Sequence, residues 1–378
     1  MKRTLIYFDN AATTPVFPEV AELMFQLVSG NYGNPSSIHE IGRRAKVELE
    51  AARRQIARLL HVQPGEIYFT SGGTEANNAL LWGCCKSLKR KRFITTKLEH
   101  PSVIQTLESL REFMGCSIEF VLVNEQGAPD LDHLESLLFD GAPAVVSLMH
   151  ANNEIGNLLP VEKVGELCKK YGALFHSDTV QTIGKMAIDI DRSPFDFAVV
   201  SAHKFHGPKG AGAMFVRSGK GIGPFVSGGS QERNMRAGTE NLAGIVGMAK
   251  ALELSYVDMD ITEGRIKKIR DFLLEALPAE IPGLRFNGNP MGQAIYTILN
   301  VSLPAGMDAD MLLPRLDLAG VCVSTGSACS SGSNKPSHVL SALGIDQKTP
   351  NLRLSFSRNN TLEEAERLVE VLKEMYKK

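Results

Sequence analysis

Between residues 66 and 216, short apolar segments alternate with stretches of helical pattern, and this alternation constrains the fold more than any other feature of the sequence. Each apolar segment is brief, as expected for strands that are buried on both faces of a largely parallel sheet. The strand candidates are residues 67–70, 93–96, 118–123, 144–149, 173–176, 197–201 and 212–216. Helical stretches occupy residues 75–88, 102–114, 131–139 and 161–171. Helices that alternate with strands cover the faces of a sheet, so we expect a layered α/β domain.

The pattern changes after a glycine-rich interval at residues 219–229. Helical stretches follow at residues 241–256 and 261–277, and a charged helix is expected at residues 362–377. Further strand candidates in this part are residues 295–302, 320–324 and 352–355. We therefore predict a large α/β domain with a mostly parallel sheet at residues 15–256, and a smaller α+β domain built from residues 1–14 and 257–378.

Composition and charge exclude several classes of function. With 43% hydrophobic and 22% charged residues, the chain can bury a large core. Its formal net charge of -1 gives no electrostatic reason to bind nucleic acid or a membrane. The basic run from Lys89 to Arg92 is better explained as a solvated turn than as an RNA-binding patch, because no aromatic residues interleave with it.

The sequence also lacks the signals of export. No apolar stretch is long enough to cross a membrane, and the N-terminal apolar run at residues 5–8 is too short for a secretory signal. The 6 cysteines show no metal-ligand spacing, and Cys84 is adjacent to Cys85. We expect reduced thiols, no metal site, and a soluble cytoplasmic protein.

Ligands of open parallel sheets bind beyond the carboxyl ends of the strands, so the residues that follow each strand carry most of the functional information. The first strand is followed by Ser71-Gly72-Gly73-Thr74-Glu75, which opens a helix. Glycines allow close approach of an anion to the backbone, and a helix N-terminus favours negative charge. This segment therefore suits a phosphate, although a plain turn capped by Thr74 explains it equally well. It does not match the P-loop pattern.

The next strand ends carry polar residues that each have a structural explanation on their own. His100 precedes a helix and, taken alone, fits a structural residue better than a functional one. The pair Asn152–Asn153 is typical of a turn. Asp178 ends an apolar strand, and burial of its carboxylate costs several kcal/mol unless a cation or donors meet it.

The last of these strands is followed by Ser201-Ala202-His203-Lys204-Phe205, with glycines soon after. A buried ammonium is costly, so a lysine directly after an apolar strand favours a chemical function such as Schiff-base formation. Consecutive strand ends thus supply a phosphate cradle, a histidine, amides, an acid and a lysine. A pyridoxal-phosphate site requires this set of groups, and coincidence at every strand end is a poor explanation for it.

Segments spread over the chain resemble the signature segments of the cysteine desulfurases, which belong to the class V aminotransferase group of pyridoxal-phosphate enzymes. The resemblance covers residues 5 to 360 approximately. The segments that carry it are FDNAATTP (8–15), YGNPSSIH (32–39), FTSGGTEANN (69–78), EHPSV (99–103), HANNEIG (150–156), HSDTVQT (176–182), SAHKFHGPKG (201–210), RAGTEN (236–241) and STGSACSS (324–331). It implies a fold-type I transferase fold, pyridoxal 5'-phosphate as cofactor and L-cysteine as substrate.

The resemblance also implies what individual residues do around the cofactor ring. Lys204 would hold the cofactor covalently and later move the substrate α-proton, and Asp178 would pair with the protonated pyridine nitrogen. His100 would stack on the ring and is the best candidate for moving protons among the thiols. Gln181 and Asn153 would hydrogen-bond near the ring hydroxyl and the substrate.

Other matching positions concern the phosphate, the partner subunit and the substrate. Gly73, Thr74, Ser201 and His203 would hold the phosphate. Thr239, in RAGTEN, matches a threonine that completes the phosphate site of the neighbouring subunit, which implies a homodimer. In the segment LRLSFSR, Arg353 matches the arginine that grips the substrate carboxylate.

Cys329 is the residue that would receive the sulfur. Its segment, residues 324–333, is too rich in glycine and serine for a core and is predicted to form a mobile loop. A nucleophile that attacks the substrate sulfur and then delivers a persulfide needs such mobility. The other cysteines are expected to be buried, inert thiols: Cys84, Cys85, Cys116, Cys168 and Cys322.

Three alternatives remain open at this point. A related aminotransferase or β-lyase would not need Cys329, and a selenocysteine lyase would need its thiol less. A catalytically silent persulfide carrier on the same fold is disfavoured by Lys204, Asp178 and Thr74, which such a carrier would not need. The sulfur acceptor is expected to be an iron–sulfur scaffold or a thiolation enzyme. The sequence ends at Lys378, without the longer C-terminal extension that relatives use to dock iron–sulfur scaffolds, so the acceptor stays undetermined.

Overall fold

The computed structural model describes residues 5–304, 309–326, 337–346 and 348–376. Its largest sheet has seven strands in the order β2-β8-β7-β6-β5-β3-β4. The strands are β2 (Ile67–Thr70), β3 (Arg92–Thr95), β4 (Ser117–Phe120), β5 (Ala144–Ser147), β6 (Leu174–Ser177), β7 (Phe197–Ser201) and β8 (Gly212–Val216). The predicted strands are therefore present, with bounds that differ by one to three residues in places.

Most neighbours in this sheet are parallel. Strands β4, β3, β5, β6 and β7 pair in parallel, and β8 is antiparallel to both β7 and β2. Strand β2 consequently runs in the same direction as β7. The carboxyl ends of β2, β3, β5, β6 and β7 therefore lie at one edge of the sheet, as the site prediction requires.

Both faces of the sheet are buried against helices. Val146 and Val200 belong to one hydrophobic core, whereas their neighbours Val145 and Val199 belong to another. Successive side chains of a strand point to opposite faces of the sheet, so neighbouring apolar residues pack into two different cores. The helices around this sheet are α1 (Pro18–Gly30), α2 (Glu40–Leu59), α3 (Gly73–Lys86), α4 (Pro101–Met114), α5 (Leu131–Leu138), α6 (Val161–Tyr171), α7 (Gln231–Asn234) and α8 (Leu242–Val257).

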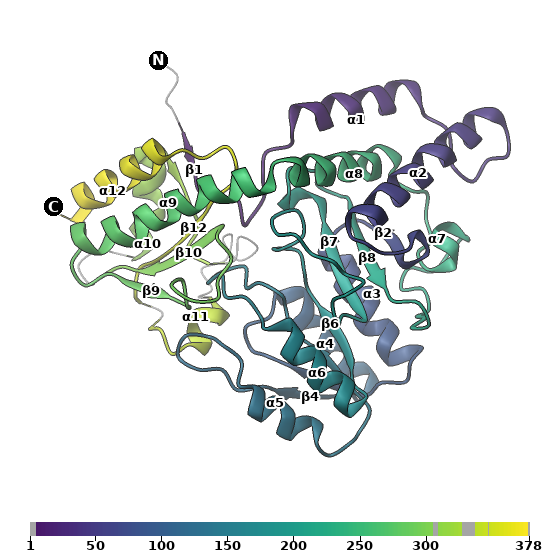
Figure 1. Cartoon of the computed structure of the whole chain (residues 1–378), viewed down its shortest axis with the longest axis horizontal. Helices are drawn as coiled ribbons and strands as arrows, with labels where there is room; N and C mark the ends of the chain where they lie inside the picture. Colours follow the sequence, from purple (N-terminus) through teal and green to yellow (C-terminus); the bar gives the residue numbers. More distant parts are fainter. Residues whose placement is uncertain (1–4, 305–308, 327–336, 347, 377–378) are drawn as a thin grey trace.

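The C-terminal part forms a second layered body that the N-terminal segment joins (Figure 1). A three-stranded antiparallel sheet has the order β12-β10-β9, and β1 pairs in parallel with β11. The elements are β1 (Ile6–Tyr7), α9 (Met259–Glu280), β9 (Arg285–Asn287), β10 (Ile298–Ser302), α10 (Ala309–Ala319), β11 (Val321–Cys322), α11 (His338–Ala342), β12 (Asn351–Ser355) and α12 (Leu362–Tyr376).

A separate hydrophobic core holds this second body together. Ile6 and Phe8 pack in one cluster with Leu299, Leu354 and Leu368. The strand β1 thus carries the start of the chain into the core of the C-terminal part, and the following residues lead to the edge of the large sheet. The division into domains at residues 14 and 256 stays a prediction. Within the described ranges, no helix combines the length and the apolar character needed to cross a bilayer.

Candidate active site

One cavity at the carboxyl edge of the large sheet brings the predicted site residues together. Its lining includes Gly73, Thr74, His100, Asn153, Asp178, Gln181, Ser201, His203, Lys204 and Arg353. Cys329 lies outside the described residues. Thr239 is described, is exposed to solvent, and does not line this cavity. The cavity also includes residues that we did not predict, namely Ala11, Ala12, Asn77, Ser102, Met149 and Val180.

Lys204 follows β7 in a short 3-10 turn, Ala202–Lys204. Its Nζ donates to the backbone carbonyls of Ala11 at 2.5 Å and Ala12 at 2.8 Å. The N-terminal segment is held against this turn, because the backbone N–H of Thr14 donates to the carbonyl of His203. The lysine is therefore oriented by backbone oxygens that come from the far end of the chain.

Asp178 follows β6 and its carboxylate is held by neutral donors. Asn77 Nδ2 donates to Oδ2 at 2.8 Å, and the backbone N–H of Val180 donates to Oδ1 at 3.0 Å. Asn77 lies on α3, so the phosphate-cradle helix also positions the acid. The side chain of Asp178 borders the cavity although the residue is only 6% exposed, so a carboxyl group in a fixed orientation faces the cavity.

A buried histidine fixes the orientation of Asn77. His176 Nε2 lies 3.1 Å from Asn77 Oδ1, and His176 Nδ1 lies 2.8 Å from the hydroxyl of Ser147. Burial lowers the pKa of His176 to about 4, so the ring is neutral. Asn77 uses its amide nitrogen toward Asp178, so its oxygen accepts and His176 carries its proton on Nε2.

His100 is the N-cap of α4. Its Nδ1 accepts from the backbone N–H of Ser102 at 3.1 Å and lies 2.7 Å from the Ser102 hydroxyl. Burial lowers the pKa of His100, so the neutral ring with its proton on Nε2 is favoured. Taken alone, a histidine here was expected to be a structural residue, and His100 does have a structural role as the N-cap of α4. The same ring borders the cavity, where a neutral imidazole can exchange protons.

Two glycines lie between β2 and the first turn of α3. Gly72 has φ +153°, and a Cβ on Gly73 would lie 2.9 Å from Val180 Cγ2, so both positions favour glycine. The N-terminus of α3 and Ser201 border the cavity. Burial and the nearby Lys204 lower the pKa of His203 to about 3, so this ring is neutral. Glycine, hydroxyl and neutral imidazole together form a cradle suited to an anion.

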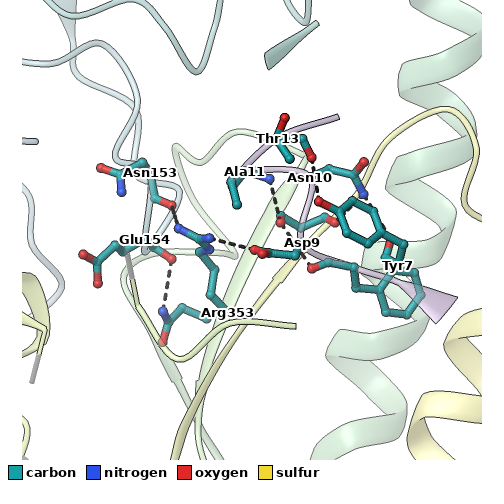
Figure 2. A network of polar contacts seen from close by, with 12 residues as sticks. Tyr7, Asp9, Asn10, Ala11, Thr13, Asn153, Glu154 and Arg353 are labelled. Atoms are coloured by element: carbon teal, nitrogen blue, oxygen red, sulfur yellow. Dashed lines mark hydrogen bonds and ion pairs between the residues drawn. The ribbon is translucent and has the colours of Figure 1, made fainter. Parts of the chain in front are cut away.

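Arg353 lies on β12 and its guanidinium is almost completely buried. One nitrogen donates to Asp9 Oδ1 at 2.8 Å and another donates to the carbonyl of Asn153 at 3.1 Å. Its Nε has no hydrogen-bond partner among the described residues. Figure 2 shows Arg353 between Asp9 and the turn at Asn153 and Glu154. The neighbouring Asn152 forms the predicted turn, because its Oδ1 accepts from the backbone N–H groups of Glu154 and Ile155.

Sequence reasoning missed several polar residues around this cavity. Lys185 donates to Gln181 Oε1 at 2.8 Å, and Asp9 holds Arg353. Glu99 is 1% exposed and accepts from the backbone N–H of Met149. A buried charge after a strand was the signal used for Asp178 and Lys204. The same signal would have found Glu99, directly before His100, whereas Lys185 lies in a turn beyond the strand end.

The cysteine predictions are mostly confirmed. Cys84, Cys85, Cys116 and Cys168 are buried, and burial raises the pKa of Cys168 to about 12 and that of Cys116 to about 11. The prediction was wrong for Cys322, which is only partly buried. Cys322 lies on the two-residue strand β11, where Val321 is buried and Cys322 is partly exposed. Successive side chains of a strand point to opposite faces, so only the Val321 side faces the core.

The chain belongs to the class-V aminotransferase family, whose model matches residues 6–368. A protein of Dictyoglomus turgidum named cysteine desulfurase IscS is 41% identical, with 99% of this chain and 96% of the relative covered. A protein of Methanosarcina thermophila with the same name is also 41% identical, over 99% of this chain and 92% of the relative.

Solved structures agree with these relatives. A structure titled NifS-like protein has a TM-score of 0.90 and 36% identity, and covers 98% of this chain and 99% of that chain. A structure titled SspA in complex with cysteine has a TM-score of 0.81 and 30% identity, with 93% of this chain and 99% of that chain covered. The family and the fold predicted from the sequence are thus confirmed.

Proposed function

We propose that this chain is a cysteine desulfurase that converts L-cysteine to L-alanine and leaves a persulfide on Cys329. The observation that carries the proposal is that Lys204, Asp178 and Arg353 border one cavity although they come from distant parts of the chain. Relatives over the whole length of the chain carry the name cysteine desulfurase, and one related structure is titled as a complex with cysteine.

The described residues fit pyridoxal 5'-phosphate as the cofactor. Gly73 and Thr74 begin α3 and border the cavity, where the N-terminus of the helix suits a phosphate. Asp178 supplies a fixed carboxylate for the pyridine nitrogen, and Lys204 supplies the amine. Asn77 and Val180 each donate a hydrogen bond to this carboxylate, which fixes its orientation. When bound, the cofactor makes the bonds at the Cα of an amino acid labile by accepting their electrons.

The residues around the cavity divide the work between binding and proton movement. Arg353 binds the substrate carboxylate, and its buried position between Asp9 and Asn153 fixes the direction of its donors. Lys204 removes the substrate α-proton, and the hydrogen bond from its Nζ to the Ala11 carbonyl holds its side chain in position. Asp178 would stabilise the positive charge of the cofactor's pyridine nitrogen. His100 moves protons between thiols through Nε2, because Ser102 occupies its Nδ1.

Cys329 would act as nucleophile on the sulfur of the substrate. Its thiolate forms a bond to that sulfur while the Cβ–S bond of the substrate breaks, and the carbon takes up a proton to end as alanine. The sum is one cysteine plus one thiol giving one alanine plus one persulfide, so no external oxidant or reductant is needed. The persulfide then passes to an acceptor protein, either an iron–sulfur scaffold or a thiolation enzyme.

The enzyme would act as a homodimer in the cytoplasm, where thiols stay reduced. Large apolar side chains are exposed on α1, on α2, in the segment between them and at residues 225–226, and a second subunit would cover them. These side chains are Phe25, Val28, Tyr32, Ile38, Val47, Phe225 and Val226. Thr239 is exposed and does not line the cavity of its own subunit, as expected for a residue that serves the partner's phosphate site.

The test of this function is a product count. Purified protein is incubated with L-cysteine and a reductant, and alanine, sulfide and bound persulfide are measured per subunit. We expect equal amounts of alanine and sulfide, a visible absorbance, and a label on Lys204 after borohydride treatment. Release of pyruvate and ammonia instead would identify a β-lyase, and activity confined to selenocysteine would identify a selenocysteine lyase.

A further inference from the structure

Lys185 is a buried lysine that the reaction outlined above does not use. It is 8% exposed and follows β6 in the turn that also contains Gln181. Burial of an ammonium is costly unless a carboxylate compensates it. The charged groups that act on Lys185 are two cations, Lys204 and Arg353. No ion pair between Lys185 and a carboxylate is found within the described ranges. A buried amine without a counter-charge needs a functional explanation.

Hydrogen bonds connect Lys185 to Lys204 through one amide and one carbonyl. Lys185 Nζ donates to Gln181 Oε1 at 2.8 Å, and Gln181 Nε2 donates to the Ala11 carbonyl at 3.1 Å. The same carbonyl accepts from Lys204 Nζ at 2.5 Å. Because protonated Lys185 can only donate, it turns the oxygen of Gln181 toward itself and the amide nitrogen toward Ala11 and the site.

The turn that places Lys185 is determined by close packing. Gly184 has φ +79°, and a Cβ on it would lie 2.5 Å from Phe205 Cβ. The hydroxyl of Tyr296 donates to the carbonyl of Lys185 at 2.5 Å. The backbone on either side of Lys185 is thus fixed to the residue after Lys204 and to the C-terminal part. Lys185 and Lys204 also border a second cavity, which shares Lys204 with the first.

The charges that act on Lys185 are positive, and two imidazoles on which Lys185 acts are neutral. Lys204 and Arg353 raise the cost of its charge, and the nearby rings of His203 and His206 are neutral because burial lowers their pKa values to about 3 and about 4. Burial, with Lys204 and Arg353, lowers the pKa of Lys185 to about 7. The coupling between two titrating amines is reciprocal, so Lys185 also disfavours a proton on Lys204.

We propose that Lys185 is a positioning residue for Lys204: it fixes the Gln181 amide at the shared Ala11 carbonyl and, as a second cation in the same buried space, destabilises a proton on the Lys204 nitrogen. A lysine beside another cationic group in a dry pocket is a more reactive nucleophile and base. This inference rests on the proposed function, because it assumes that Lys204 is the residue that holds the cofactor.

The experiment is a pH titration of the visible absorbance of the holoenzyme without substrate, which follows the proton on the cofactor-bound Lys204 nitrogen. We compare the wild type with Lys185→Met, which removes the charge, and Lys185→Arg, which keeps it. Lys209→Met is the matched control, because Lys209 is exposed and also acts on His203. We expect the midpoint to rise by about one pH unit in Lys185→Met, a tenfold change in proton affinity, and to stay near the wild-type value in the other two.

An unchanged midpoint in Lys185→Met overturns the inference. An equal shift in Lys185→Met and Lys185→Arg also overturns it, because a shift that does not depend on charge is a packing effect. If Lys185→Met does not fold, Lys185→Gln carries the same comparison. Failure of the proposed function has a different signature: borohydride would then label a lysine other than Lys204 in the wild type, whatever the midpoints.

Discussion

The guanidinium of Arg353 donates to Oδ1 of Asp9 across 2.8 Å, although the two residues come from opposite ends of the chain. The side chain of Arg353 is 1% exposed and that of Asp9 is 18% exposed, so water screens this pair weakly. The segment that contains Asp9 also supplies the carbonyls that hold Lys204. The start of the chain therefore orients both Arg353, the proposed substrate-binding cation, and Lys204, the proposed cofactor-binding amine.

Asp9→Asn should destabilise the protein and weaken cysteine binding. The substitution keeps the shape but leaves a buried guanidinium without its counter-charge, which costs about 2–3 kcal/mol after allowance for the partial exposure of Asp9. Urea unfolding measures the loss, and we expect KM for cysteine to rise more than kcat falls. Glu40→Gln is the matched control, since the Arg44–Glu40 pair is exposed and its loss should change stability little. Equal stability of Asp9→Asn and the wild type would show that Asp9 does not compensate Arg353.

The sequence predicted the large sheet well because its strands carry a local signal. Residues 67–70, 197–201 and 212–216 match β2, β7 and β8, since strands buried on both faces of a sheet are short apolar runs bounded by glycine and polar residues. Helices α1 and α2 were not predicted. Arg53 shows why α2 was missed: its charge lies inside the core, where Glu232, which is 179 residues away, holds it.

The site was predicted from residue types at strand ends, and its supports were not. Lys204 is held by backbone carbonyls of Ala11 and Ala12, and a backbone oxygen leaves no mark in the sequence. Asn77 reaches Asp178 from a helix 101 residues earlier, a contact that exists only after the sheet has formed. Local pattern therefore identified residues that border one cavity, while the groups that orient them follow from tertiary structure.

Asp178→Asn should bind the cofactor but exchange the Cα proton of cysteine at least a hundredfold more slowly, about 2.7 kcal/mol of barrier. An amide cannot stabilise positive charge at the pyridine nitrogen as a carboxylate does. Deuterium exchange at Cα of cysteine measures this step without turnover. Asn77→Ala is the comparison: it removes one neutral donor from the carboxylate and should slow exchange much less. Exchange in Asp178→Asn at the wild-type rate would make Asp178 a structural residue.

Subunits that are inactive for different reasons should restore activity when they are mixed. Lys204→Ala lacks the amine of its own site, and Thr239→Ala lacks the hydroxyl that serves the partner's phosphate site. A mixed dimer then contains one site with both residues intact, so we expect activity to recover toward one native site per mixed dimer. Subunit exchange is verified with tags of different mass. Verified exchange without recovery would mean that each subunit completes its own site.

Cys329→Ala should lose persulfide and alanine formation while keeping the early response to cysteine. Cofactor binding and α-proton removal use Lys204, Asp178 and Arg353, and the substitution removes none of them. The visible spectrum should therefore still change when cysteine is added. Cys322→Ala, a partly buried cysteine in the same part of the chain, is the control and should keep wild-type turnover. If Cys329→Ala forms alanine and sulfide at the wild-type rate, the thiol mechanism is wrong.

Glu99 should make the stability of the protein fall as the pH rises through neutrality. Burial, with a smaller contribution from Asp178, raises the pKa of its carboxyl from 4.5 to about 8. Its Oε2 has no partner among the described residues, so nothing favours the ionised form there. Between pH 4.5 and about pH 8 the folded protein keeps the Glu99 proton that the unfolded chain releases. Unfolding is then favoured by higher pH, and the loss ends above about pH 8.

Glu99→Gln removes this titration. From pH 5 to pH 8 the free energy of unfolding of the variant should therefore rise relative to that of the wild type, by about 1.4 kcal/mol per pH unit at most and a few kcal/mol in total. Urea unfolding at each pH gives the difference directly. Glu66→Gln is the matched control, because hydrogen bonds from the backbone of Ser218 and Gln63 lower the pKa of Glu66 against the effect of burial. Its contribution to stability is lost only as the pH falls below the ordinary carboxyl range, so the Glu66→Gln difference should stay constant from pH 5 to pH 8. A Glu99→Gln difference that is equally constant would mean that Glu99 is ionised in the folded protein.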